Sequence, residues 1–271
     1  MGYEIKERSV GEILDAAFHL YRNHFRVFVA AAFCVAVPVA LLGSFVDWAI
    51  AGDAQALEAL PHAGADDLAS KARALLASSI SFTVRRVGHV LEDGAMTLIV
   101  SDAYLGQPLS VASGYRRSFA ALWPLLGTWA LATLGMALGL MCLIVPGVLV
   151  ILCWAFNTPA VVIEGRGARA SLARSRELTT GNYGRLFLLY LVSGGVSWGI
   201  GLGLRSLIPD AVLAIPVLEK LVRLVPQILL APIGVAAITL AYFDVRVRKE
   251  GFDLERLVLG LGQPESAVLR P

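Results

Sequence analysis

The sequence VFVAAAFCVAVPVALLGSFVDWAI occupies residues 27–50 and decides the class of fold to which this chain belongs. Its only charged side chain is Asp47, close to its C-terminal end. A helix of about 20 apolar residues is long enough to cross the hydrocarbon core of a bilayer. The segment therefore predicts a transmembrane helix. Over the whole chain, 57% of residues are hydrophobic and 16% are charged, which indicates an integral membrane protein.

Further apolar segments follow the first one along the chain. They predict spans at residues 74–104, 119–143, 148–163, 186–207 and 221–243. Between the third and fourth spans lies Pro146-Gly147, a turn-forming pair, so these two spans are expected to form a tight helical hairpin. The predicted fold is all-α, a polytopic bundle of six transmembrane helices that forms one membrane domain over residues 1–271.

The polar residues before the first span predict an amphipathic helix over residues 9–26. Ser9 and Glu12 have the spacing of a capping box, in which each side chain bonds the other residue's backbone N–H. The apolar side chains recur at helical spacing, at Leu14, Phe18, Tyr21 and Phe25. This face is expected either to lie on the inner membrane surface or to pack on the bundle, and both readings stay open here.

The distribution of basic residues predicts the orientation of the chain. If the N-terminus is inside, the inner segments carry 16 of the 23 basic residues and the outer segments carry five. Short loops rich in Lys and Arg are retained in the cytoplasm. We therefore expect a multi-pass protein of the bacterial inner (plasma) membrane. Both termini are expected in the cytoplasm, with residues 244–271 as a cytoplasmic tail.

The second predicted span carries the most unusual side chains of the chain. The candidate intramembrane polar site consists of Arg85, Arg86, His89, Glu92 and Asp93. All five fall within an arc of about 120° on a helix. Each charge at a bilayer centre costs roughly 2.5–3.5 kcal/mol, so this face is not expected to contact lipid. Either it lines a polar pathway, an ion site or a headgroup pocket, or it forms an ion-paired patch near the outer surface.

A second candidate region is the cytoplasmic surface, where basic residues attract anionic lipid headgroups by about 1 kcal/mol each. The candidate residues for surface or headgroup contacts are Glu164, Arg169, Arg174, Arg176, Arg185, Asp244, Arg246 and Arg248. The segment 244–255 mixes both signs of charge and is predicted on the same side as the loop 164–176. We expect these two segments to pair and to fix the cytoplasmic surface.

Small residues mark two predicted helix-packing faces. Gly135 and Gly139 are spaced four residues apart on the third span, and a longer ridge on the fifth span consists of Gly195, Gly199 and Gly203. Small residues at this spacing let helices approach closely. We expect contacts within one chain rather than between two copies.

Several stretches of the chain resemble one bacterial membrane family. The most specific is AYFDVRVRKEGFDLE at 241–255, and further similarity lies in GEILD at 11–15, LYRNHF at 20–25, VPG at 145–147 and PAVVIEG at 159–165. Together they resemble the glycerophosphoryl diester phosphodiesterase membrane domain. The resemblance implies a polytopic protein of about six spans with a poorly defined role. The phosphodiesterase activity belongs to relatives with an additional barrel domain, for which this chain has no room, and is not expected here.

The sequence shows no pattern typical of an enzyme. The four histidines have no ligand spacing, the three cysteines form no CxxC pair, and no catalytic triad or phosphate-binding loop is present. We expect no catalytic, metal-binding or cofactor-binding residues and no nucleic-acid partner. The predicted function is a non-enzymatic membrane protein that binds or organises a lipid or a partner protein. The alternative is a small transporter that uses the polar face of the second span.

Overall fold

The computed structural model of the chain describes residues 9–51, 65–209 and 216–251. Every regular element in these ranges is a helix, which confirms the all-α prediction. By length and composition, the chain is a multi-pass membrane protein. The helical segments long and apolar enough to cross a membrane, among the described residues, are Phe25–Val46, Leu122–Cys142, Ile144–Val162, Tyr183–Ser206 and Leu224–Glu250.

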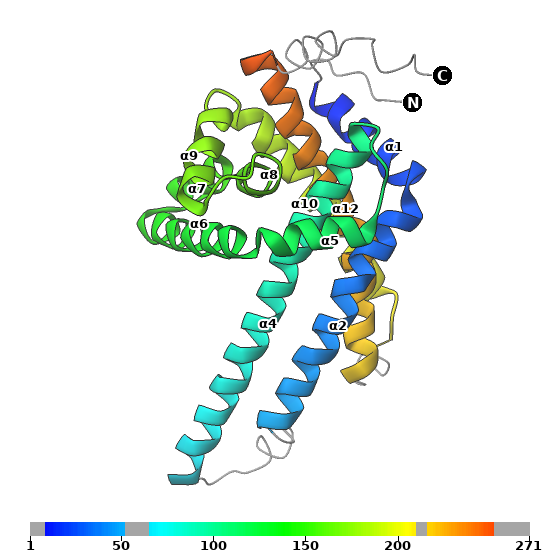
Figure 1. Ribbon diagram of the computed structural model, residues 1–271. Coiled ribbons are helices and arrows are strands. Elements are labelled where there is room, and N and C mark those ends of the chain that lie inside the picture. Colours follow the sequence, from blue (N-terminus) through cyan, green and yellow to red (C-terminus); the bar gives the residue numbers. More distant parts are fainter. Residues whose placement is uncertain (1–8, 52–64, 210–215, 252–271) are drawn as a thin grey trace, which may run out of the picture.

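The helices follow a recurring order along the chain (Figure 1). Short helices α1, α5 and α9 each precede a long apolar helix, α2, α6 and α10. The helices are α1 (Val10–Asn23), α2 (Phe25–Ala51), α4 (Ala65–Tyr104), α5 (Val111–Ala120), α6 (Leu122–Cys142), α7 (Ile144–Cys153), α8 (Asn157–Val162), α9 (Ala168–Thr179), α10 (Tyr183–Ser206) and α12 (Pro216–Glu250).

The helices α2 and α4 run side by side as a long antiparallel pair, and α5 and α6 run across α4 (Figure 1). Ser81 of α4 donates a hydrogen bond to the carbonyl of Gly43 in α2 at 3.2 Å. Further along, Gly88 lies so close to Val39 that an added Cβ would clash with that side chain. This register sets the depth of every residue of α4 relative to the apolar segment of α2.

The predicted second span, 74–104, is not among the helical segments that are apolar enough to cross a membrane, whereas each of the other five predicted spans overlaps one of them. It lies within α4, whose 40 residues would extend about 60 Å, twice the thickness of a bilayer core. The charged residues in its middle lower its mean hydropathy. Because α4 packs antiparallel along α2, a membrane that α2 crosses surrounds this part of α4 as well.

The capping box predicted at the start of α1 is present. The Ser9 backbone N–H donates to the Glu12 carboxylate at 2.6 Å, and the Glu12 N–H donates to the Ser9 hydroxyl at 3.3 Å. The helix packs on the bundle, mainly against α12, which decides between the two readings of its apolar face. Its buried side chains are Ile13, Ala17, Leu20 and Tyr21, whereas Phe18 and Phe25 are about half exposed, so the predicted face was partly wrong.

The main apolar core lies around the C-terminal part of α12. Tyr242 and Phe243 are fully buried there, Phe243 stacks on Tyr104 of α4, and Tyr242 contacts the ring edge of Phe156. The helix continues through these residues to Glu250. The predicted cytoplasmic tail, residues 244–271, therefore begins within α12, and residues 252–271 lie outside the described part of the chain.

The predicted hairpin is present as α6 and α7, but its turn lies at Leu143. Pro146 and Gly147 were predicted as the turn and instead lie in the first turn of α7, where proline is tolerated. Gly139 faces Gly147 across this hairpin, and a Cβ added at Gly139 would lie 3.0 Å from the Gly147 Cα. Gly135 lies against the ring of Trp154. The small-residue face of α6 therefore packs within the chain. In α10, by contrast, an added Cβ at Gly195, Gly199 or Gly203 would meet no described atom within 4 Å.

Replacing Gly139 by leucine should destabilise the protein by about 1–3 kcal/mol, because the new side chain must displace α7 from a closely packed contact. The matched control is Gly199→Leu on the open face of α10, which gains the same helix propensity without a clash. Thermal unfolding in detergent compares the two variants. Equal melting temperatures for both would show that the α6–α7 contact contributes no close packing.

Candidate functional site

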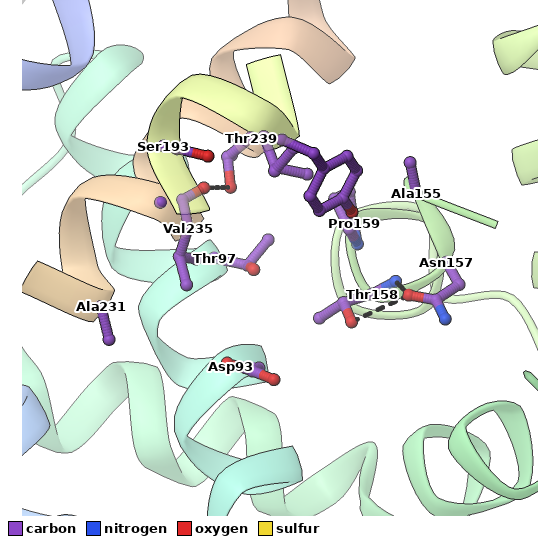
Figure 2. Close-up of a pocket in the computed structure, with 13 residues that line it drawn as sticks. Asp93, Thr97, Ala155, Asn157, Thr158, Pro159, Ser193, Ala231, Val235 and Thr239 are labelled. Atoms are coloured by element: carbon purple, nitrogen blue, oxygen red, sulfur yellow. Dashed lines mark hydrogen bonds between the residues drawn. The ribbon is translucent and has the colours of Figure 1, made fainter. Parts of the chain in front are cut away.

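A polar cavity of about 360 Å³ lies where four helical segments meet. It is lined from α4, from the chain at α8, from α10 and from α12 (Figure 2). The polar lining residues are Asp93, Thr97, Asn157, Thr158, Tyr190, Ser193 and Thr239. Figure 2 shows Asp93 and Thr97 pointing from α4 into the space that Asn157 and Thr158 border from the other side.

Asp93 lies level with the middle of the apolar segment of α2. Since Gly88 packs on Val39 and the helices are antiparallel, Asp93 comes opposite about residue 34, halfway along Phe25–Val46. A carboxylate at this depth would cost roughly 2.5–3.5 kcal/mol if it faced lipid. Its exposed surface faces the cavity instead. Among the described residues, no donor lies within hydrogen-bonding distance of the Asp93 carboxylate.

A break in the fourth predicted span supplies the opposite wall of the cavity. The segment 148–163 was predicted as one helix, but residues 154–156 separate α7 from α8. The freed backbone groups are bonded by α9: the Ser175 hydroxyl accepts from the Phe156 N–H at 3.0 Å and donates to the Cys153 carbonyl at 2.9 Å. Thr179 donates to the same carbonyl at 3.1 Å. Breaks at membrane depth are tolerated when such partners exist.

Part of the cavity lining presents hydrogen-bond acceptors, while the amide of Asn157 and the hydroxyl of Tyr190 also carry donors. The hydroxyls of Ser193 and Thr239 donate to the carbonyls of Leu189 and Val235 in their own helices, at 2.7 and 2.8 Å. Their donor hydrogens are thereby used, and their oxygen lone pairs remain as acceptors. With the carboxylate of Asp93, these groups favour a ligand that is cationic or rich in N–H and O–H donors.

The five candidate residues of the second span fall into two groups. Arg85 and Arg86 are exposed, and Arg85 lies against Gly43, three residues before the apolar segment of α2 ends at Val46. The guanidinium of Arg86 lies over the ring of Phe82. The positions of these two arginines agree with the second interpretation of this group, a patch near the outer membrane surface.

The other three residues of this group lie deeper in the bundle. Glu92 is buried, and its carboxylate is 3.4 Å from Nδ1 of His89. The same His89 nitrogen lies 3.4 Å from the amide of Gln227 in α12. Glu92 thus has a partner next to the cavity, while Asp93 borders the cavity itself.

The predicted cytoplasmic residues form an ion-paired cluster between the α8–α9 connection and the end of α12. We define the Glu164 cluster as Glu164, Arg174, Tyr242, Arg246 and Glu250. The Glu164 carboxylate accepts from the Tyr242 hydroxyl at 2.6 Å and from Arg174 Nε at 3.0 Å. Arg174 also pairs with Glu250, to which Arg246 donates at 2.9 Å. The structure thus brings together the two segments that were expected to pair.

The environment of Glu164 favours its charged form. Burial alone would raise the pKa of this carboxyl group. Hydrogen bonds from Tyr242, Arg166 and Arg174, together with the positive charge of Arg174, outweigh burial and lower the pKa below its ordinary value. Burial alone would lower the pKa of Arg174, but its hydrogen bonds to Glu250 and Glu164 outweigh burial and raise this pKa. The pair of Glu164 and Arg174 is therefore ionised near neutral pH.

A second pair of contacts anchors the same end of α12. Asp244 is 3% exposed, and its carboxylate lies 3.1 Å from Arg185 and 3.0 Å from Arg248. Arg169 and Arg176, by contrast, lie on the exposed face of α9. Most of the basic residues predicted to contact headgroups are therefore engaged in pairs within the protein, and these two arginines remain at the surface.

Sequence reasoning identified Asp93 but missed the rest of the cavity lining. The pattern of no single span brings these residues together, because four different predicted spans contribute them: Thr97, Asn157, Thr158, Ser193 and Thr239. One signal was present in Asn157-Thr158-Pro159, because a proline in this position marks the start of a new helix. Among the described residues, no group of three or more His, Cys, Asp or Glu side chains is arranged to hold a metal ion.

Comparisons with known proteins identify no relative of this chain, since no family model, curated protein or solved structure matches it.

Proposed function

We propose that this chain is a non-enzymatic membrane protein that binds a small cationic or donor-rich ligand inside its helical bundle. The observation that carries the proposal is the cavity around Asp93, part of whose lining presents hydrogen-bond acceptors. A cavity of this volume with a few convergent polar groups is typical of a ligand site. The carboxylate at mid-membrane depth is costly, and intramembrane ionisable groups of this kind usually serve a function.

The proposal also includes the location of the protein in a bacterial inner membrane and the orientation of its chain. The excess of basic residues in the predicted inner segments supports cytoplasmic termini in a bacterial inner membrane. The resemblance of residues 241–255 supports membership of the glycerophosphoryl diester phosphodiesterase membrane domain family. The organisation of a partner protein stays a prediction, since the exposed apolar faces of α6 and α10 are equally suited to lipid.

Transport of the ligand is the second candidate function. Two features of the helices around the cavity favour transport. The chain is non-helical between α7 and α8 at the edge of the cavity, and α12 contains Pro226 and Pro232. Proline removes a backbone hydrogen bond and permits bending. Interrupted helices of this kind line binding sites in membrane transporters.

Native mass spectrometry of the mildly extracted protein tests the proposed function. The wild-type protein should carry a bound small molecule or lipid, and Asp93→Asn should lose at least nine-tenths of it, because no other described residue that lines the cavity is charged. The control Asp15→Asn removes an exposed carboxylate on α1 and should retain the ligand. Equal retention by Asp93→Asn and wild type would contradict the proposal.

A further inference from the structure

A second cavity adjoins the one around Asp93, and none of the described residues that line it is charged. It has a volume of about 200 Å³ and lies between α6 and α7. Thr133, Met136, Val150, Ile151 and Trp154 line it, so its walls are mainly apolar. Asn157 and Tyr190 line both cavities and form their common boundary. A polar chamber and an apolar slot therefore lie next to each other in the bundle.

The apolar slot extends toward the outer surface of the bundle. Ile151 is 38% exposed and Leu149, on the same short helix, is 44% exposed. Leu134 and Leu138 on α6 are exposed as well. A chain that leaves the polar cavity past Asn157 and Tyr190 would thus pass through the slot to a surface suited to lipid.

We propose that the ligand is a phospholipid with an amine in its headgroup and one acyl chain in the slot between α6 and α7. This inference rests on the proposed function and names its ligand class. The ammonium group sits at the Asp93 carboxylate, where the Ser193 and Thr239 oxygens accept its further hydrogens. The amide of Asn157 and the hydroxyl of Tyr190 lie at the boundary, where the phosphate of such a lipid needs donors.

Charge and polarity both favour this class over the alternatives. An anionic headgroup without an amine would bring its phosphate toward Asp93 with no cation between them, and like charges repel strongly in a site of low dielectric. A soluble amine would satisfy Asp93 but leave the apolar slot without an occupant. An amphiphile with a cationic head fits both cavities, because its head pairs with the Asp93 carboxylate and its apolar chain packs against the apolar side chains of the slot.

The test is a native mass spectrometry titration of the delipidated full-length protein. Phosphatidylethanolamine and phosphatidylglycerol with identical acyl chains are the probes. One phosphatidylethanolamine should bind with at least tenfold higher affinity than phosphatidylglycerol, and Asp93→Asn should abolish this preference. Met136→Trp, which fills the slot, should weaken phosphatidylethanolamine binding at least fivefold. The control Met141→Trp, on the 84% exposed end of α6, should leave it unchanged.

The outcomes separate this inference from the proposed function. Water-soluble glycerophosphoethanolamine carries the same headgroup without acyl chains. If it binds as tightly as the lipid, the lipid identity is overturned while the proposed function stands. Equal binding of the two phospholipids, or an unchanged preference in Asp93→Asn, also overturns the inference. If the wild-type protein binds none of the three probes and carries no ligand after mild extraction, both proposals fail.

Discussion

Replacing Arg174 by alanine should lower the free energy of unfolding by about 3–5 kcal/mol, the loss expected when one partner of a buried ion pair is removed. The Arg174 side chain is 9% exposed and contacts three carboxylates, Glu164, Glu177 and Glu250. Its removal leaves Glu164, itself 10% exposed, with one of its cationic partners missing. The end of α12 then loses the ion pair between Glu250 and α9 and keeps the hydrogen bonds from Lys249 to the end of that helix.

The matched control for this variant lies on the same helix. Arg169 is exposed on α9, and Arg169→Ala should change stability by no more than about 0.5 kcal/mol. Denaturant unfolding of the purified protein in detergent measures both variants. A loss for Arg174→Ala no larger than that for Arg169→Ala would show that the Glu164 cluster contributes little to stability.

The pH dependence of this effect follows from the pKa of Glu164. A carboxyl group whose pKa is lower in the folded state stabilises the fold above its unfolded pKa, near 4.3, and loses this contribution as the pH falls further. Glu164 is such a group, although burial opposes its ionisation. The difference between wild type and Arg174→Ala should therefore be largest near pH 7. It should narrow as the pH falls below about 4.

The helical elements that local chemistry specifies were predictable from sequence. The Ser9–Glu12 capping box and the break between α6 and α7 each depend on residues a few positions apart, and both are present, although the break lies at Leu143 and Pro146-Gly147 belong to the first turn of α7. The apolar face of α1 was placed less well, since Phe18 and Phe25 fit the helical period but the bundle buries Ile13 and Leu20 instead. Helical spacing alone does not determine which part of a broad apolar face meets the neighbouring helix.

The candidate site was predictable only where a charge appears in an apolar context. Asp93 stood out for this reason, and the antiparallel packing of α2 and α4 then fixed its depth. Ser193 and Thr239 carried no such signal, because hydroxyls in transmembrane helices commonly bond their own backbone, as these two do. The break before Asn157 depends on Ser175, which is 19 positions away from Phe156, so it required the tertiary structure.

The charge of Asp93 should control the chemistry of its cavity, and this effect is the largest that we expect at the site. A unit charge about 8 Å away contributes roughly 2 kcal/mol at an effective dielectric constant of about 20. The effect has opposite signs for a cation and an anion that enter the cavity. A thiol placed at Ser193 should therefore react at least tenfold faster with a cationic reagent than with an anionic one.

The most direct test of a cation-selective polar cavity inside the bundle is the labelling of Ser193→Cys in membranes. The background has serine at Cys34, Cys142 and Cys153, and the reagents are a trimethylammonium and a sulfonate methanethiosulfonate. The structure predicts a cationic preference that Asp93→Asn removes, and little reaction at Ser197→Cys, whose residue does not line the cavity. No reaction at Ser193→Cys, or equal rates for both reagents with Asp93 present, would contradict the account.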